Sequence, residues 1–384
     1  MGEQVGVLWP ALFAQGVKIN FAHRTFSWQS EASGAAHVHV VIIGFALHDT
    51  DRKTIYEYED IKGEPKAIPA TRISPYLIEG PALAVVNRTR PICDVPEIDF
   101  GNQPIDGGNL ILDENEVEPF RASTKHADKF LRPFVGAREF IQGTRRWCIW
   151  ITLSNVKYLS RSQALTARVQ GVKRFRESSK RAATRQLAAS AGYFAFVSHR
   201  DRPYLLIPSV SSERREYIPM GFMDARTIAS NLCLTIFDAL PFHFGVLASA
   251  MHMAWVRQVG GRLKSDFRYS GKLIYNNYPW PVEATEAQKG RIAQAAQGVL
   301  EVRQKYLDFG KTMADLYDPL YTPADLLKAH QRLDAAVDRA YRGKKFDSER
   351  ERVEFLFALY EKLTAPLTAE PKKKPGRRRG PKGC

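Results

Sequence analysis

The sequence predicts a chain that opens with the last strands of an α/β sheet, continues as a mixed α+β region and ends in a small helical bundle with a disordered basic tail. Three observations predict this fold class. A nearly continuous β-branched run occupies 38–45, short apolar runs alternate with Gly, Pro, Asn and Asp turns from about 50 to 220, and helical periodicity runs from 282 to about 366. The predicted domains are 1–50, 51–283, 284–366 and 367–384.

The first fifty residues contain a predicted helix and two strands. Apolar residues from Val5 to Phe13 recur at helical spacing, and Gly16 ends the helix. Residues 17–21 and 38–45 follow as strands, and the second run is apolar enough for a strand that is covered on both faces. These elements do not make a stable domain alone. Either the start is truncated, or they complete a sheet supplied by something else.

The mixed region contains one basic helical patch, at 167–181. Apolar residues recur there every three positions, with cations around them. Lys173 and Arg174 are candidate contacts to nucleic-acid phosphates, and a solvated helix face is the alternative for both.

Two further helical regions follow. Residues 242–257 form an amphipathic helix that ends at Gly260, and its Met and aromatic side chains indicate core packing. After Pro281 the apolar spacing predicts three or four helices packed as a small bundle. The last fourteen residues contain too much Pro, Gly and charge to fold.

The charge balance indicates a polyanion as partner. The chain has 56 Lys and Arg against 41 Asp and Glu, a net charge of +15, and a pI near 9.6. Residues 371–384 carry seven of these cations and no acid, which leaves +8 for the first 370 residues. A basic domain of this kind is typical of nucleic-acid binders, although membrane surfaces and RNA attract it equally. We expect the tail to add nonspecific attraction to phosphates.

The sequence predicts a soluble, cytoplasmic protein. It has no run of 18 apolar residues and no signal-peptide pattern at its start. The cysteines are widely separated and form no C-x-x-C motif, which suits a reducing compartment better than a disulfide scaffold or a zinc site.

Lys264, Asp266 and Arg268 are the strongest candidates for a functional site. Their spacing of i, i+2 and i+4 places all three on one side of an extended strand. Lys and Arg donate to O6 and N7 of guanine, and Asp accepts from N4 of cytosine. The alternative is a solvated strand face with a weak ion pair.

Three further arginines are candidate phosphate contacts. Arg214 and Arg215 follow two serines and are suited to hold a phosphate or a base edge, whereas an ion pair with Glu213 or Glu216 is equally compatible. Arg262 precedes the predicted recognition strand and is the third candidate.

No catalytic, cofactor-binding or metal site is predicted in this chain. Neither G-x-G-x-x-G nor G-x-x-x-x-G-K-[ST] occurs in it. His37 and His39 have no carboxylate or cysteine at ligand spacing, so packing or solvent explains them. Residues 276–281 superficially resemble the Asn-Pro-Pro-Tyr motif of amino-methyltransferases, but the order of residues is wrong and we reject a catalytic role.

Several longer motifs resemble MmeI-like (type IIL) restriction–modification enzymes, in the right order and over the whole chain except its tail. Two motifs resemble the last strands of that family's class I methyltransferase domain: Ile19–Trp28 and Ala36–Phe45. Five resemble its target recognition domain: Phe100–Leu110, Ser211–Pro219, Gly261–Leu263, Tyr269–Ser270 and Tyr275–Pro281. Two resemble its C-terminal helical segment: Ala314–Pro319 and Ala329–His330.

The resemblance implies part of an S-adenosylmethionine-dependent adenine-N6 DNA methyltransferase, with double-stranded DNA as partner. The family's nuclease, glycine loop and Asn-Pro-Pro-Tyr motif lie upstream of the matching region. We therefore expect no cofactor to be held by this chain and no methyl transfer by this chain alone.

The resemblance also implies roles for the candidate residues. The positions matching Lys264 and Asp266 act in the family as a coupled specificity pair, either Glu with Arg or Lys with Asp, and Arg268 matches a further recognition residue. The Lys–Asp combination implies that a G·C pair is read in one orientation.

Three interpretations remain open. The first is a DNA-recognition module. The second is half of a split methyltransferase, in which an exposed sheet edge near residues 17–45 docks a separate chain carrying the catalytic motifs. The third is a nonfunctional remnant that binds nucleic acid through charge alone.

Overall fold

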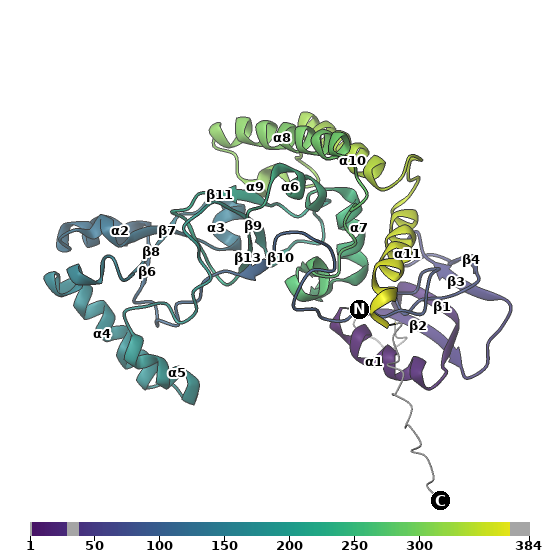
Figure 1. Cartoon of the computed structure of the whole chain (residues 1–384), viewed down its shortest axis with the longest axis horizontal. Helices are drawn as coiled ribbons and strands as arrows, with labels where there is room; N and C mark the ends of the chain where they lie inside the picture. The colour runs from purple at the N-terminus through teal and green to yellow at the C-terminus, as the bar shows by residue number, and fades with distance from the viewer. Residues whose placement is uncertain (1, 29–37, 369–384) are drawn as a thin grey trace, which may run out of the picture.

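The computed structural model describes residues 2–28 and 38–368, and the predicted basic tail lies outside these residues. The described chain is elongated, with a sheet near the N-terminus at one end and helices at the other (Figure 1). No helix within the described ranges has the length and apolar character needed to cross a membrane. The helices are α1 (Glu3–Ala14), α2 (Glu114–Ser123), α3 (Ala137–Gln142), α4 (Gln163–Glu177), α5 (Ala182–Gln186), α6 (Pro241–Leu247), α7 (Ala250–Val259), α8 (Glu286–Asp308), α9 (Met313–Leu316), α10 (Ala324–Tyr341) and α11 (Glu349–Thr368).

The N-terminal helix leads into a sheet of order β2-β1-β3-β4. β1 pairs antiparallel with β2 and parallel with β3, and β3 pairs antiparallel with β4. The sheet therefore continues across residue 50, where the sequence interpretation placed a domain boundary. Its strands are β1 (Lys18–Trp28), β2 (Val38–Ala46), β3 (Lys53–Glu57) and β4 (Lys66–Ala70).

The prediction that residues 38–45 are covered on both faces is wrong. β2 is an edge strand, and Val41, Ile42 and Phe45 are 40%, 39% and 56% exposed. A β-branched run reports strand propensity and apolar character, but it does not reveal whether the chain supplies a neighbour to cover that strand.

The middle of the chain forms two more four-stranded sheets and a small three-stranded one, as the mixed α+β prediction requires. α4 and α5 lie at the end of the molecule opposite the N-terminal sheet (Figure 1). One large sheet has the order β11-β9-β13-β5, with β5 (Ile98–Phe100), β9 (Tyr204–Pro208), β11 (Gly221–Met223) and β13 (Cys233–Phe237). The other has the order β12-β7-β8-β6, with β6 (Ile111–Asp113), β7 (Leu131–Val135), β8 (Arg146–Ile149) and β12 (Ile228–Ala229).

The predicted helix over 242–257 is two helices, α6 and α7. Ser249 separates them with an extended backbone, and its hydroxyl caps α7 by accepting from the backbone N–H of His252. The apolar spacing runs through both helices, so periodicity alone did not reveal the break. A serine at such a position accepts a hydrogen bond from a backbone N–H and so favours the start of a new helix over continuation of the old one.

The C-terminal region is helical as predicted. α8 packs along α10 and against α6, whereas α11 packs against α7. α8 and α10 lie along one edge of the molecule (Figure 1). The C-terminal helices are thus built onto the helices that precede the predicted recognition strand.

Candidate nucleic-acid interface

The candidate recognition residues lie on a hairpin and not on one extended strand, so that prediction is corrected. β14 (Gly261–Leu263) pairs antiparallel with β15 (Asp266–Arg268), and Leu263 faces Asp266 across the last pair before the turn. Lys264 lies in the two-residue turn with φ of 57°. That region is disfavoured for a residue with a Cβ. A Gly or Asn in the turn would have signalled a hairpin, and the sequence has neither at this position.

The hairpin presents the three predicted base-recognition residues differently. Lys264 and Arg268 are exposed, and Asp266 is half-buried. Asp266 and Arg268 share one face of β15, with the buried Phe267 facing the other way. In the described residues, neither Lys264 nor Arg268 makes a side-chain hydrogen bond or ion pair, so their donors are free for a ligand.

Arg262 holds the hairpin together. Its guanidinium lies 4.0 Å from the centre of the Phe267 ring, and its Nη1 donates to the carbonyl of Ser265 at 2.9 Å. Partial desolvation of the guanidinium lowers the pKa of Arg262 from its ordinary value. The predicted phosphate contact at Arg262 would have to coexist with this packing role.

The Ser211–Arg215 segment lies beside the hairpin. β10 (Val210–Ser211) pairs with β15, which gives a sheet of order β10-β15-β14. The backbone N–H of Glu213 lies 3.4 Å from Oδ1 of Asp266. Arg214 is exposed, and Arg215 is half-buried with its Nη1 3.5 Å from Oγ of Ser211. Neither arginine pairs with Glu213 or Glu216 within the described ranges.

The predicted phosphate contacts Lys173 and Arg174 lie on α4, in a different part of the molecule (Figure 1). Both are exposed, and Lys173 is 3.9 Å from Glu177. The neighbouring Arg176 is fully buried and donates to five backbone carbonyls. The structure therefore brings six of the eight predicted residues together around β15 and leaves these two apart.

A cleft of about 570 Å³ next to the hairpin contains residues that sequence reasoning missed. It is lined by Arg262 and Lys264 from the hairpin, Arg24 and His39 from the N-terminal sheet, and Arg257 from α7. Arg24 is paired with Glu57, and Arg257 is paired with Glu349. Only the tertiary structure brings these strands near the hairpin, so no sequence spacing signalled the cleft. His37, the other histidine considered from the sequence, lies outside the described residues.

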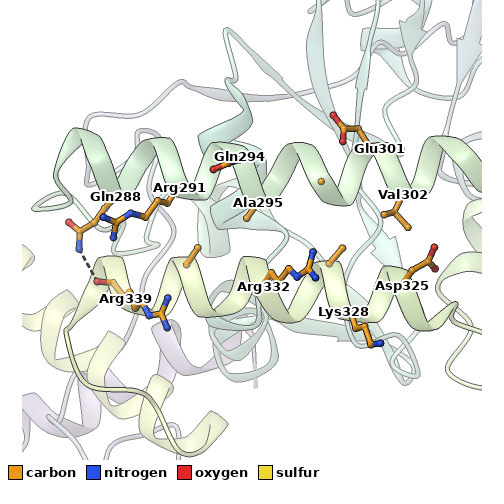
Figure 2. Close-up of a pocket in the computed structure, with 13 residues that line it drawn as sticks. Gln288, Arg291, Gln294, Ala295, Glu301, Val302, Asp325, Lys328, Arg332 and Arg339 are labelled. Atoms are coloured by element: carbon orange, nitrogen blue, oxygen red, sulfur yellow. Dashed lines mark hydrogen bonds between the residues drawn. The ribbon is translucent and has the colours of Figure 1, made fainter.

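A second cationic surface lies in a groove between α8 and α10 (Figure 2). Arg291 projects from α8, and Lys328, Arg332 and Arg339 project from α10. In the part of the chain that the structure describes, none of these four has an acidic partner within 4.0 Å. The floor of the groove contains small side chains such as Ala295.

The Asn-Asn-Tyr-Pro segment is held in the core. Asn277 is fully buried, and its Nδ2 donates to the carbonyls of Val86, Lys272 and Leu273. Its Oδ1 accepts from Nε of Arg88 and from the hydroxyl of Tyr360, both at 3.0 Å. These partners use the amide fully, which gives Asn277 a structural role.

No cluster of three or more histidine, cysteine, aspartate or glutamate side chains suited to a metal ion occurs in residues 2–28 and 38–368.

The architecture is that of a mixed α/β recognition domain flanked by part of an α/β sheet and by a helical C-terminal domain. Family models match each part: the DNA-methyltransferase domain of MmeI over residues 1–57, its target recognition domain over 79–282 and its C-terminal domain over 284–368. The chain belongs to the MmeI family, and the predicted fold class and family resemblance are confirmed.

Two relatives show the extent of the match. DNA methyltransferase A of Bacillus subtilis (strain 168) is 39% identical over 363 residues, which are 94% of this chain and 40% of that protein. A solved structure of the type IIL restriction-modification enzyme MmeI in complex with DNA is 46% identical with a TM-score of 0.84, over 95% of this chain and 48% of that one. The chain therefore spans less than half the length of either relative.

Proposed function

We propose that this chain recognises a specific sequence in cytoplasmic duplex DNA, as the target-recognition part of an adenine-N6 DNA methyltransferase or restriction–modification enzyme. The observation that carries the proposal is the hairpin of β14 and β15, which presents Lys264 and Arg268 with free donors and Asp266 beside them. The MmeI relative was solved with DNA, which supports the same class of partner for this chain.

The chemistry of the hairpin suits one base pair. A lysine ammonium donates to O6 and N7 of guanine, and an aspartate accepts from N4 of the paired cytosine. We infer that Lys264 and Asp266 read a G·C pair in one orientation, with Arg268 at a neighbouring position. We propose that Arg214 and Arg215, on the adjacent segment, contact phosphates and so set the register of the chain on DNA.

We propose that S-adenosylmethionine, which the family resemblance implies for the complete enzyme, is not held by this chain, because the sequence contains no G-x-G-x-x-G cofactor loop. No step of the proposed function uses the cofactor. We propose that residues of the complete enzyme outside the region matched by this chain hold it.

The test is selection of binding sites from random duplex DNA with the full chain at about physiological salt. We expect an enriched motif with a fixed G·C pair. Exchange of the two charges, Lys264→Glu with Asp266→Arg, is expected to invert the preferred base at that position, because each partner then meets its complement on the opposite strand. Each lost contact should cost about 1–3 kcal/mol of discrimination.

The matched control exchanges an exposed ion pair on α8, Glu286→Lys with Lys289→Glu, whose atoms lie 2.8 Å apart in the unaltered chain. It leaves composition and net charge unchanged and should retain the original preference. Binding without any enriched motif would defeat the proposal and favour attraction by charge alone. An unchanged base preference in the Lys264–Asp266 exchange would remove those two residues from base recognition.

A second candidate function is docking of a separate chain that carries the catalytic motifs. The exposed apolar side chains of edge strand β2 favour it, because an unpaired edge of this kind accepts a further strand. We expect methyl transfer from labelled S-adenosylmethionine only when such a chain is added, and Phe45→Lys should weaken that complementation. Methyl transfer by the purified chain alone would contradict this candidate.

A further inference from the structure

Asp334 of α10 joins the two segments that support the hairpin. Its Oδ2 accepts from the hydroxyl of Tyr217 at 2.7 Å, and its Oδ1 accepts from the backbone N–H of Ala250 at 2.7 Å. Tyr217 lies 117 residues earlier in the chain, and Ala250 is the first residue of α7. One carboxylate of the C-terminal helical domain therefore touches both segments at once.

The first segment leads from Tyr217 to the base-reading residues. Its tyrosine is 5% exposed and its ring stacks on the buried His330 of α10, with ring centres 4.0 Å apart. Four residues before it, the backbone N–H of Glu213 approaches Asp266 at 3.4 Å. Arg214 and Arg215 lie between these two anchor points, so the position of Tyr217 sets the position of both arginines.

The second segment leads from Ala250 through α7 into β14. α7 ends at Val259, and the hairpin begins two residues later at Gly261. Arg257, in the last turn of α7, donates through Nη2 to the carbonyl of Glu216 at 2.9 Å and pairs with Glu349 of α11. The two segments are thus tied to each other at Arg257 and to the helical domain at Asp334.

A half-buried carboxylate is a costly way to hold two segments, because desolvation disfavours its charged form and raises the pKa of Asp334 to about 6. Its geometry has one advantage over other residues. Two oxygens that only accept can fix two donors arriving from different directions, whereas an amide offers one acceptor and an apolar side chain offers none. This arrangement favours orientation over stability as the role of the residue.

We propose that Asp334 and Tyr217 are positioning residues through which the C-terminal helical domain sets the orientation of the DNA-reading hairpin and its neighbouring arginine segment. The inference rests on the proposed function, and it assigns the helical domain a part in sequence selectivity. Tyr217 is buried and Asp334 is half-buried, and we propose that both act through Asp266, Arg214 and Arg215.

The test compares Tyr217→Phe and Asp334→Asn with Tyr306→Phe in the full chain. Tyr306 donates to Asp325 at 2.8 Å, which is the same kind of bond between α8 and α10 but away from the hairpin. The readout is the ratio of Kd values for the selected duplex and for one with the G·C pair reversed. We expect that ratio to fall about tenfold in Tyr217→Phe and Asp334→Asn and to stay constant in Tyr306→Phe.

Amide hydrogen exchange gives a second measurement that needs no DNA. Tyr217→Phe should speed exchange in residues 212–217 and 261–268, and Tyr306→Phe should not. Wild-type selectivity together with wild-type exchange in Tyr217→Phe would overturn the inference while leaving the proposed function intact. Absence of any base preference in the unaltered chain would instead defeat the proposed function, and this inference with it. If Asp334→Asn does not fold, Tyr217→Phe decides the question.

Discussion

Replacing Lys264 by glycine should separate the two properties that meet in the hairpin turn, its strain and its recognition chemistry. Lys264 has φ of 57° in a two-residue turn, a conformation that costs a residue with a Cβ about 1–2 kcal/mol. Glycine removes that strain, but it loses more backbone entropy on folding, which offsets about 0.5–1 kcal/mol of the gain in stability. The net expectation is a hairpin stabilised by roughly 0.5–1 kcal/mol.

Amide hydrogen exchange over residues 261–268 measures this local stability directly. Lys264→Gly should slow exchange there by about two- to fivefold, since RT is about 0.59 kcal/mol. Lys264→Ala is the matched control: it also removes the ammonium but keeps the strained φ, so exchange should be unchanged or faster. Both variants should lose about 1–3 kcal/mol of discrimination for the G·C pair.

Two outcomes would refute this reasoning separately. Equal exchange in the Gly and Ala variants would mean that the turn is not strained at Lys264. Full discrimination in both variants would mean that the ammonium does not contact the base.

Two further predictions follow from the site. Arg214→Ala and Arg174→Ala should each reduce the slope of log K against log salt by about one unit without changing the base preference. The control Arg291→Ala, on the α8–α10 groove, should leave that slope unchanged. An unchanged slope in Arg214→Ala and Arg174→Ala would exclude these two residues as phosphate contacts. The stability of the unaltered chain relative to Asp334→Asn should fall by about 2 kcal/mol between pH 4 and pH 6.5, because desolvation raises the pKa of Asp334 to about 6. The stabilising contribution of the protonated carboxyl is full below the pKa of the unfolded chain and is lost as the pH rises through the folded value. A flat difference over that range in denaturant unfolding would contradict this prediction.

Much of the fold follows from local pattern. The spacing that begins at Val5 predicts α1, the apolar run at 38–45 predicts β2, and the periodicity after Pro281 predicts α8, α10 and α11. What local pattern does not give is the environment of each element. The exposure of β2 depends on which segments neighbour it, and the break at Ser249 depends on a capping bond that the apolar spacing conceals.

The candidate site was predictable in residue type and not in geometry. The alternation of Lys264, Asp266 and Arg268 pointed to base recognition, but an extended strand was the wrong backbone because lysine gives no turn signal. Arg214 and Arg215 were identified as cations, and only the pairing of β10 with β15 places them beside the hairpin. Asp334 gave no signal at all, because its partner Tyr217 is 117 residues away.

The buried amide of Asn277 sets a limit on how specificity can be transplanted within this family. A graft of the recognition domain alone would end near residue 283, before Tyr360, whose hydroxyl donates to Oδ1 of Asn277. Such a graft would also leave Trp255 without Phe357 and Tyr360, the α11 rings whose centres lie 5.2 and 5.7 Å from it. A graft that keeps these contacts therefore extends through α11, so the helical domain must be moved together with the recognition domain it packs against.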